Sequence, residues 1–278
     1  MTPRELVSST SGYLRRHGVP QARLDAELLL AHVMDVERVD LYLGRVQPVG
    51  ATDRARYRDL VEKRARQRVP IAYLIGVREF WSRAFRVTPD VLIPRPETEA
   101  LVEAAVALAP ERVAEIGIGS GAVTGAIALE LPRARFVAVD CSRAALALAR
   151  ENLERLGVAG RVAFVRGDVT TSLRGPFDLI VSNPPYIPSA EWERLPPEVR
   201  SEPRLALDGG VDGLAFVRRL AHEAPRLLAR PGCLALEVGR GQAGAVRACL
   251  EEVGASAVET RTDLAGTERV VLACFREL

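Results

Sequence analysis

The chain of 278 residues contains few cysteines, and none of them forms a CxxC pair or stands near a histidine cluster at metal spacing. The four are Cys141, Cys233, Cys249 and Cys274. We therefore expect buried free thiols and no metal site. The chain also lacks an apolar stretch long enough to cross a bilayer, and residues 1–18 lack the apolar core of a signal peptide. These absences predict a cytoplasmic protein with no membrane partner.

A strong net charge is absent as well. The 38 basic and 36 acidic residues leave a formal charge of +2, which gives no long-range field toward nucleic acid or membranes. A predicted helix over 53–68 is locally basic, and it is either a solvated helix face or a docking face for an acidic partner or RNA. Hydrophobic residues make up 48% of the chain, enough for a full core in one large or two ordinary domains.

The pattern of apolar residues divides the chain into three parts. Residues 1–75 have helical spacing and predict a helical domain, and residues 76–94 are typical of a β-hairpin, which we interpret as a linker. Over 95–278, strands alternate with helices, which indicates an α/β domain with a mostly parallel sheet and helices on both faces. The last two strands, near 256–261 and 269–275, have no helix between them and should pair antiparallel at one edge. The predicted helices of this domain span 122–131, 142–156, 216–228 and 243–253, and its earlier strands span 112–116, 136–139, 162–165, 177–181 and 233–238.

A glycine loop follows the first strand of this domain. In Glu115-Ile-Gly117-Ile-Gly119-Ser-Gly121, the glycines let the backbone approach a ligand closely, although a tight turn with a helix N-cap is the structural alternative. Asp140 ends the next strand about 20 residues on, where a carboxylate can accept hydrogen bonds from ribose hydroxyls. These features suit NAD or S-adenosylmethionine equally.

Two carboxylates favour S-adenosylmethionine. Glu115 precedes the first glycine by two residues, where it can bind an ammonium group but would repel a pyrophosphate. Asp168 ends the third strand, where it either accepts from the adenine amino group or caps its own loop.

The tetrapeptide Asn183-Pro184-Pro185-Tyr186 follows an apolar strand. The prolines have no N–H and restrict φ, so the loop is stiff and its carbonyls have no proline donors beside them. Asn183 adds a side-chain carbonyl acceptor, and Tyr186 adds a flat aromatic face. Two acceptors and a ring can hold a planar –NH2 group, while the structural alternative is a rigid turn after a strand.

Together these motifs resemble those of S-adenosylmethionine-dependent N-methyltransferases that act on amino groups. With the helical N-terminus and the segments GVREFW (76–81), PRPETE (94–99) and SEPRLALDGGVDGL (201–214), the whole chain is similar to the peptide chain release factor N5-glutamine methyltransferases. The resemblance implies a Rossmann-like seven-stranded methyltransferase domain, S-adenosyl-L-methionine as cofactor, and methylation of the Gly-Gly-Gln glutamine of release factors 1 and 2. The cofactor contacts it implies are Glu115, Gly117, Ile118, Gly119, Ser120, Gly121, Asp140, Asp168 and Asn183.

From both arguments we expect Asn183, Pro184 and Tyr186 to be catalytic and the whole tetrapeptide, Pro185 included, to bind the substrate. Asn183 Oδ1 and the Pro184 carbonyl would each accept one N–H of the glutamine amide, and Tyr186 would pack on the amide plane. The sulfonium methyl would lie in line for displacement, so catalysis is mostly positioning and electrostatics.

Three other functions stay open. A DNA- or RNA-base N-methyltransferase would need a flipped base and a basic channel. A nicotinamide-dependent oxidoreductase is disfavoured by Glu115, and a non-catalytic docking protein by the intact motifs. We expect a monomer without a nucleic-acid partner, whose N-terminal domain (1–75) recognises the substrate protein. The sequence assigns no role to Arg95, Glu97 or Glu99.

Overall fold

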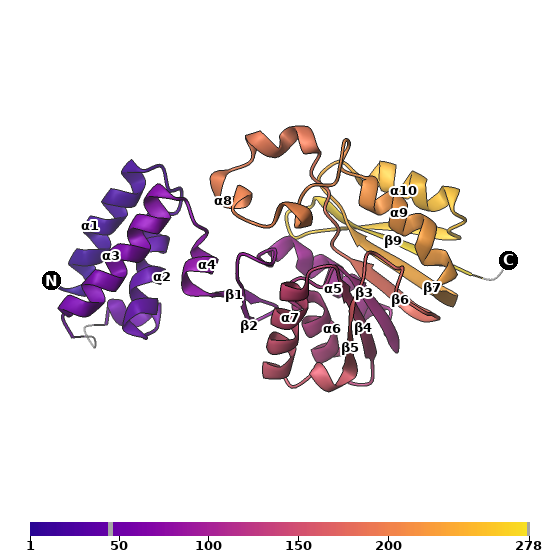
Figure 1. Cartoon of the computed structure of the whole chain (residues 1–278), viewed down its shortest axis with the longest axis horizontal. Helices are drawn as coiled ribbons and strands as arrows, with labels where there is room; N and C mark the ends of the chain where they lie inside the picture. Colours follow the sequence, from indigo (N-terminus) through magenta and orange to yellow (C-terminus); the bar gives the residue numbers. More distant parts are fainter. Residues whose placement is uncertain (44–46, 277–278) are drawn as a thin grey trace. The chain divides into compact units, whose positions relative to one another are not determined.

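The computed structural model describes residues 1–43 and 47–276, so residues 44–46 of the predicted helical domain and 277–278 of the predicted methyltransferase domain lie outside the described part. The chain forms two compact units (Figure 1). One unit is Met1–Val77 with Pro196–Ser201, and the other is Arg78–Leu195 with Glu202–Leu278. Within the described ranges, no helix is long and apolar enough to cross a membrane.

The first unit is helical, as predicted. Its α-helices in the described ranges are α1 (Pro3–Arg16), α2 (Ala22–Met34), α3 (Ala51–Arg66), α4 (Ile71–Ile75) and, from the later segment, α8 (Pro197–Arg200). A capping box starts α1, because the Thr2 side chain accepts from Glu5 N and the Glu5 side chain accepts from Thr2 N. Leu14, Leu29 and Leu30 are fully buried and form the centre of the core of this unit.

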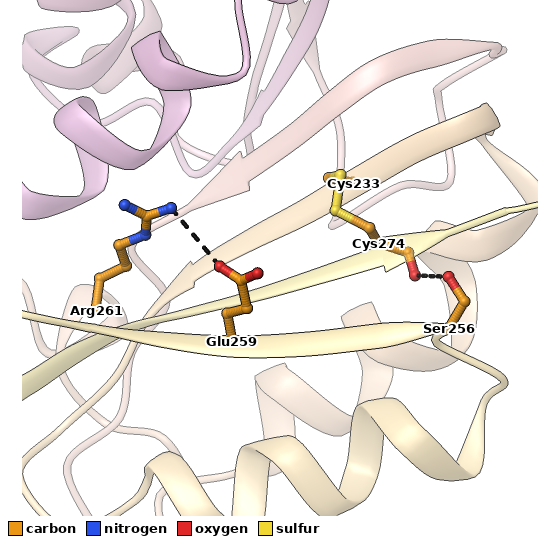
Figure 2. The surroundings of a disulfide bond; sticks show 5 residues. All are labelled: Cys233, Ser256, Glu259, Arg261 and Cys274. Carbon is orange, nitrogen blue, oxygen red and sulfur yellow. Dashed lines mark hydrogen bonds and ion pairs between the residues drawn. A yellow bond between two sulfur atoms is a disulfide. The ribbon is translucent and has the colours of Figure 1, made fainter.

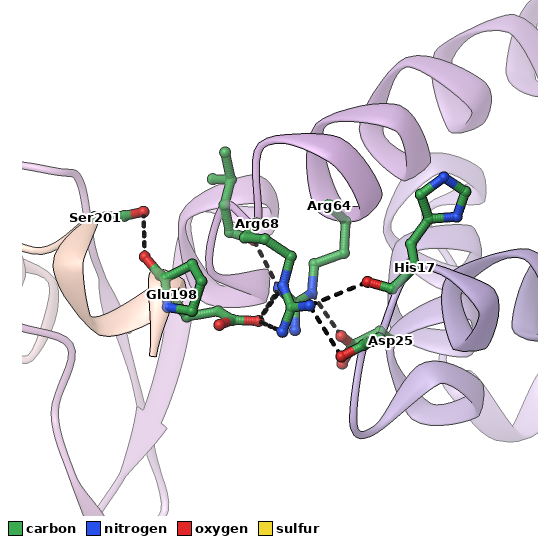
Figure 3. A network of polar contacts seen from close by, with 9 residues as sticks. His17, Asp25, Arg64, Arg68, Glu198 and Ser201 are labelled. Carbon is green, nitrogen blue, oxygen red and sulfur yellow. Dashed lines mark hydrogen bonds and ion pairs between the residues drawn. The ribbon is translucent and has the colours of Figure 1, made fainter. Parts of the chain in front are cut away.

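An ion-pair network ties the later segment Pro196–Ser201 into this unit (Figure 3). Glu198 Oε1 accepts from Arg64 Nη1 at 2.8 Å and from Arg68 Nη2 at 2.6 Å. Arg64 Nε also donates to Asp25 Oδ2 at 2.7 Å, and the Arg64 side chain is only 7% exposed. Arg64 and Arg68 of the predicted basic helix therefore form ion pairs within this unit and are not part of an open docking face.

The predicted hairpin is present as β1 (Val77–Phe80) and β2 (Arg83–Arg86). Phe80 and Phe85 meet edge to face with ring centroids 6.2 Å apart, and both are buried in the same core as Leu101 and Ile127. The aromatic residues of the hairpin thus belong to the core of the second unit.

The second unit contains a seven-stranded sheet with the order β5-β4-β3-β6-β7-β9-β8. The first five of these strands are parallel, while β9 runs antiparallel to both β7 and β8, which confirms the predicted antiparallel edge. The strands are β3 (Arg112–Ile116), β4 (Arg135–Asp140), β5 (Val162–Arg166), β6 (Phe177–Ser182), β7 (Leu228–Glu237), β8 (Ala257–Thr262) and β9 (Glu268–Phe275).

Helices cover both faces of this sheet, which confirms the predicted α/β architecture. Alternate residues of a strand face opposite sides, so Leu179 belongs to one core and Ile180 to the other. One face is covered by α5 (Glu99–Ala107), α6 (Ala122–Glu130) and α7 (Arg143–Arg155), and the other by α9 (Ala215–Glu223) and α10 (Ala243–Glu252).

The helix predicted over 216–228 is shorter than expected. It ends at Glu223 and is followed by a 3-10 turn over Ala224–Arg226, because Pro225 lacks an N–H and cannot continue an α-helix. The strand β7 begins at Leu228, the last residue of the predicted helix, rather than at residue 233.

The expectation of four buried free thiols was wrong. Cys233 and Cys274 lie directly opposite each other on β7 and β9 and form a disulfide (Figure 2). Cys141 and Cys249 are free, but Cys141 is exposed and Cys249 is only half-buried. The disulfide covalently joins two neighbouring strands of the sheet.

Candidate active site

The glycine loop and the Asn-Pro-Pro-Tyr tetrapeptide lie next to each other. The loop follows β3 and the tetrapeptide follows β6, and the last residues of these parallel strands, Ile116 and Ser182, are paired in register. Ser182 Oγ also donates to the Ile116 carbonyl at 2.7 Å. The strand order reverses between β3 and β6, and open α/β sheets bind ligands at the carboxyl ends of strands where this happens.

A cavity of about 730 Å³ opens at this point of the second unit. Its walls come from the segment 89–98, the glycine loop, the ends of β4 and β5, the tetrapeptide and the segment 203–219. The predicted site residues that line it are Glu115, Gly117, Ile118, Gly119, Ser120, Asp140, Asp168, Asn183, Pro184 and Pro185. Gly121 and Tyr186 do not line it.

The glycines of the loop differ in what they do. Gly117 and Gly119 have φ of +80° and +53°, and a Cβ added to either would meet nothing within 4 Å. These two backbones therefore border open space, where a ligand can approach closely. Gly121 is the N-cap of α6, and a Cβ there would lie 3.2 Å from Ala149 Cβ, so its small size serves helix packing.

Glu115 is a buried carboxyl group, 3% exposed. Its Oε2 accepts from Thr124 N at 3.0 Å and from the Thr124 hydroxyl. Burial raises the pKa of Glu115 to about 8, and the nearby Asp140 charge adds to the rise, while the Thr124 bonds oppose it. A cationic ligand group beside Glu115 would stabilise its ionised form.

The other two predicted carboxylates are held by neighbours. Asp140 Oδ2 accepts from Gly119 N at 3.0 Å, and Oδ1 accepts from Ser142 N at 2.9 Å, which leaves lone pairs for a ligand hydroxyl. The Asp168 side chain is 68% exposed and pairs with Arg219 Nη1 at 2.7 Å. Arg219 lines the cavity but was missed from the sequence, because 51 residues separate it from Asp168.

Asn183 presents an unsatisfied acceptor. Its Nδ2 donates to Thr98 Oγ1 at 3.2 Å, but its Oδ1 is buried with no hydrogen-bond partner among the described residues. Buried polar atoms are nearly always hydrogen-bonded, so such an oxygen in a cavity wall suits a donor supplied by a ligand.

Tyr186 is held next to the cavity wall. Its backbone carbonyl accepts from Gln242 Nε2 at 2.9 Å. Burial raises the pKa of Tyr186 to about 12, with a smaller contribution from the charge of Glu237, so the phenol stays protonated.

The structure places the three charged residues of the segment 94–99 that the sequence left without a role. Arg95 pairs with Glu202, and Glu202 Oε2 also accepts from Ile93 N at 2.9 Å, so the two motifs 94–99 and 201–214 are joined. Glu99 Oε1 accepts from Trp81 N at 3.0 Å and secures the hairpin turn. Glu97 is exposed.

Family models and known proteins match this chain over most of its length. Residues 5–76 match the PrmC N-terminal domain, and residues 96–194 match the methyltransferase small domain. The release factor glutamine methyltransferase of Geobacter sulfurreducens is 45% identical over 97% of this chain and 95% of its own length. That of Moorella thermoacetica is 44% identical over 100% of both chains.

A solved methyltransferase from Pyrococcus furiosus shares the fold, with a TM-score of 0.55 and 18% identity over 82% of this chain and 100% of that chain. The assignment to a family rests on the sequence relatives, which match nearly the whole chain. By identity and coverage, the chain belongs to the family of release factor glutamine methyltransferases.

Proposed function

We propose that the protein transfers the methyl group of S-adenosylmethionine to the side-chain amide nitrogen of the glutamine in the Gly-Gly-Gln motif of peptide chain release factors 1 and 2. The observation that carries this proposal is the Asn183 Oδ1 acceptor, which is buried without a partner among the described residues in the wall of the cavity. A planar amide has two N–H donors, and this oxygen can accept one of them.

The chemistry of the cavity suits the cofactor. Open space borders Gly117 and Gly119, and the buried Glu115 carboxyl can bind the ammonium group of the methionine moiety. Asp140 would accept from the ribose hydroxyls and Asp168 from the adenine amino group. When bound, the cofactor supplies an electrophilic methyl group on a sulfonium.

The tetrapeptide would hold the substrate amide. An amide nitrogen is a poor nucleophile because its lone pair is delocalised into the carbonyl, so its two N–H groups must be fixed and polarised. Asn183 Oδ1 and the Pro184 carbonyl would each accept one of them. Tyr186 would pack on the amide plane only if its ring reached the cavity, which it does not line in this structure. A buried acceptor without a hydrogen-bond partner destabilises the free protein by about 1–3 kcal/mol. A substrate N–H that donates to this acceptor would offset that cost on binding. Such preorganisation favours the charge that develops on the nitrogen.

The helical unit would select the protein partner, because a pocket for one amide cannot distinguish one glutamine from another. We propose that the protein acts as a cytoplasmic monomer and that residues within Met1–Val77 contact the release factor.

Mass spectrometry tests the proposal. Release factor is incubated with the protein and S-adenosylmethionine, and the peptide with the Gly-Gly-Gln motif is fragmented. One added CH2 equivalent on the glutamine side chain is expected, and a release factor with that glutamine replaced by Ala should gain none. A parallel reaction with labelled cofactor and DNA or RNA tests the base-methylating alternative. Label in the nucleic acid without glutamine methylation would overturn the proposal.

A further inference from the structure

Val169, in the wall of the cavity, has a strained backbone. Its φ is +52°, a value that a β-branched residue rarely adopts. The residue follows β5, is buried, and lines the cavity beside Asp168. Such a conformation persists only where the surrounding contacts hold it, and residues of this kind are common at ligand sites. The contacts that hold the loop around Val169 therefore bear on what the cavity binds.

Side chains of α9 hold the residues on both sides of Val169. Arg219 Nη1 donates to Asp168 Oδ2 at 2.7 Å, and Arg219 Nη2 donates to the Asp168 carbonyl oxygen at 3.4 Å. After Val169, the Thr170 hydroxyl donates to Glu223 Oε2. Arg219 Nε joins the two contacts, because it donates to Glu223 Oε1 at 3.0 Å. One guanidinium group thus secures the strained loop at both ends.

The contact with Arg219 also sets the direction of the Asp168 carboxylate. The Asp168 side chain is 68% exposed, so without a partner it would rotate freely. Arg219 occupies Oδ2, and the second oxygen of the carboxylate can still accept a hydrogen bond from a ligand. Both side chains line the cavity. Because an exposed ion pair contributes little to stability, this arrangement points to a role in binding.

We propose that Arg219 is a positioning residue for the cofactor, and that it holds Asp168 so that one carboxylate oxygen faces the amino group of adenine. Arg219 acts through Asp168 and need not touch the cofactor itself. The inference rests on the proposed function, in which Asp168 accepts from that amino group. A guanidinium group suits this role, because its N–H groups diverge in a fixed plane and reach two carboxylates at once.

Two ligands test the proposal by calorimetry. One is S-adenosylhomocysteine, and the other is its analogue in which hydrogen replaces the 6-amino group of adenine. Wild type should prefer the first roughly tenfold or more, as expected for a hydrogen bond to a charged acceptor. In Arg219→Met we expect this preference to fall below about threefold. General damage to the fold would weaken both ligands alike and leave their ratio unchanged.

Two further variants separate positioning from a simple effect of charge. Arg219→Lys keeps the charge, but its compact ammonium does not reproduce the separated N–H groups that reach Asp168 and Glu223. Its preference for the 6-amino group should therefore also fall below about threefold. In an Asp168→Ala background, Arg219→Met should change the Kd for S-adenosylhomocysteine by less than about twofold, because nothing remains to be positioned.

Arg218→Met is the matched control. Arg218 is the preceding residue on α9 and also pairs with an aspartate, since its Nη1 lies 3.0 Å from Asp212 Oδ1. Neither Arg218 nor Asp212 is among the described residues that line the cavity. The Kd of this variant for each ligand should stay within about twofold of wild type.

The inference is overturned if wild type binds the two ligands equally, or if Arg219→Met or Arg219→Lys keeps the wild-type preference. It is also overturned if Arg218→Met loses as much preference as Arg219→Met, or if Arg219→Met weakens binding as much without the Asp168 carboxylate as with it. If Arg219→Met does not fold, Arg219→Lys with and without Asp168→Ala carries the same comparison. Failure of the proposed function looks different, because the wild-type protein itself would then leave the release factor glutamine unmethylated.

Discussion

The backbone N–H of Gly119 donates to Asp140 Oδ2 at 3.0 Å, so the glycine loop after β3 is tied to the end of β4. The second oxygen of the same carboxylate accepts from Ser142 N and holds the start of α7. One side chain thus shapes two walls of the cavity before any ligand arrives.

Asp140→Ala should weaken the binding of S-adenosylmethionine. The change removes a charged acceptor for two backbone N–H groups and, in the proposed binding mode, for the ribose hydroxyls. Each charged hydrogen bond contributes about 1.5–3 kcal/mol. We expect Kd, measured by calorimetry, to rise on the order of tenfold to 100-fold. Asp140→Asn keeps the shape and one acceptor and should lose less, and unchanged affinity in the Ala variant would remove Asp140 from the cofactor site.

Asn183→Ala should separate catalysis from cofactor binding. Loss of the buried acceptor would remove the interaction proposed with the reacting amide, so kcat should fall on the order of 100-fold to 1000-fold. The Kd for S-adenosylmethionine should change far less. Parallel methyl-transfer and calorimetric measurements check this, and an equal loss in both quantities would contradict the role given to Asn183.

The raised pKa of Glu115 should make the stability of the ligand-free protein depend on pH. Its pKa is about 8 when folded against an ordinary value of 4.5, so the folded state binds the proton more tightly than the unfolded state. The contribution of this proton to stability is complete below pH 4.5 and is lost as the pH rises to about 8, with a limiting slope of about 1.4 kcal/mol per pH unit.

Urea denaturation at several pH values measures this slope. Glu115→Gln cannot titrate, so its free energy of unfolding should fall less between about pH 5 and pH 8 than that of wild type. If the free energy of unfolding of the two proteins changes with pH in the same way, the pKa of Glu115 is not raised in the folded protein.

Arg64→Met should destabilise the helical unit strongly. Arg64 is buried between Asp25 and Glu198, and removing it leaves Asp25, whose side chain is 4% exposed, without its charge partner. Breaking a buried pair from one side costs about 3–5 kcal/mol. Urea denaturation followed by limited proteolysis of the unit measures the change.

Arg66→Met on the same helix is its matched control. Arg66 pairs with Glu62 at 2.6 Å, but their side chains are 69% and 42% exposed. The loss should be below about 1 kcal/mol. Equal losses from the two variants would mean that burial does not strengthen the Arg64 network.

Much of the fold followed from local patterns. Alternating strands and helices predicted the parallel sheet, and the absence of a helix between the last two strands predicted their antiparallel pairing. Pro225 also indicates in the sequence that α9 ends near this residue. The apolar residues after the proline nevertheless extended the predicted helix beyond its observed end.

The contacts between distant segments could not be predicted in the same way. The Cys233–Cys274 disulfide depends on the register of β7 against β9. The separation of 41 residues between the two cysteines does not reveal this register. The Asn183–Thr98 hydrogen bond joins residues 85 positions apart.

The position of β9 constrains how the sheet can assemble. Among the described residues, β9 is the one strand that pairs with β8, and it also covers the edge of β7 that β6 leaves open. During synthesis, β8 leaves the ribosome before β9. It therefore stays unpaired until β9 follows, although the five parallel strands have already been synthesised. A nascent chain halted before Glu268 would therefore present the bare edge of β7 to chaperones or to other chains.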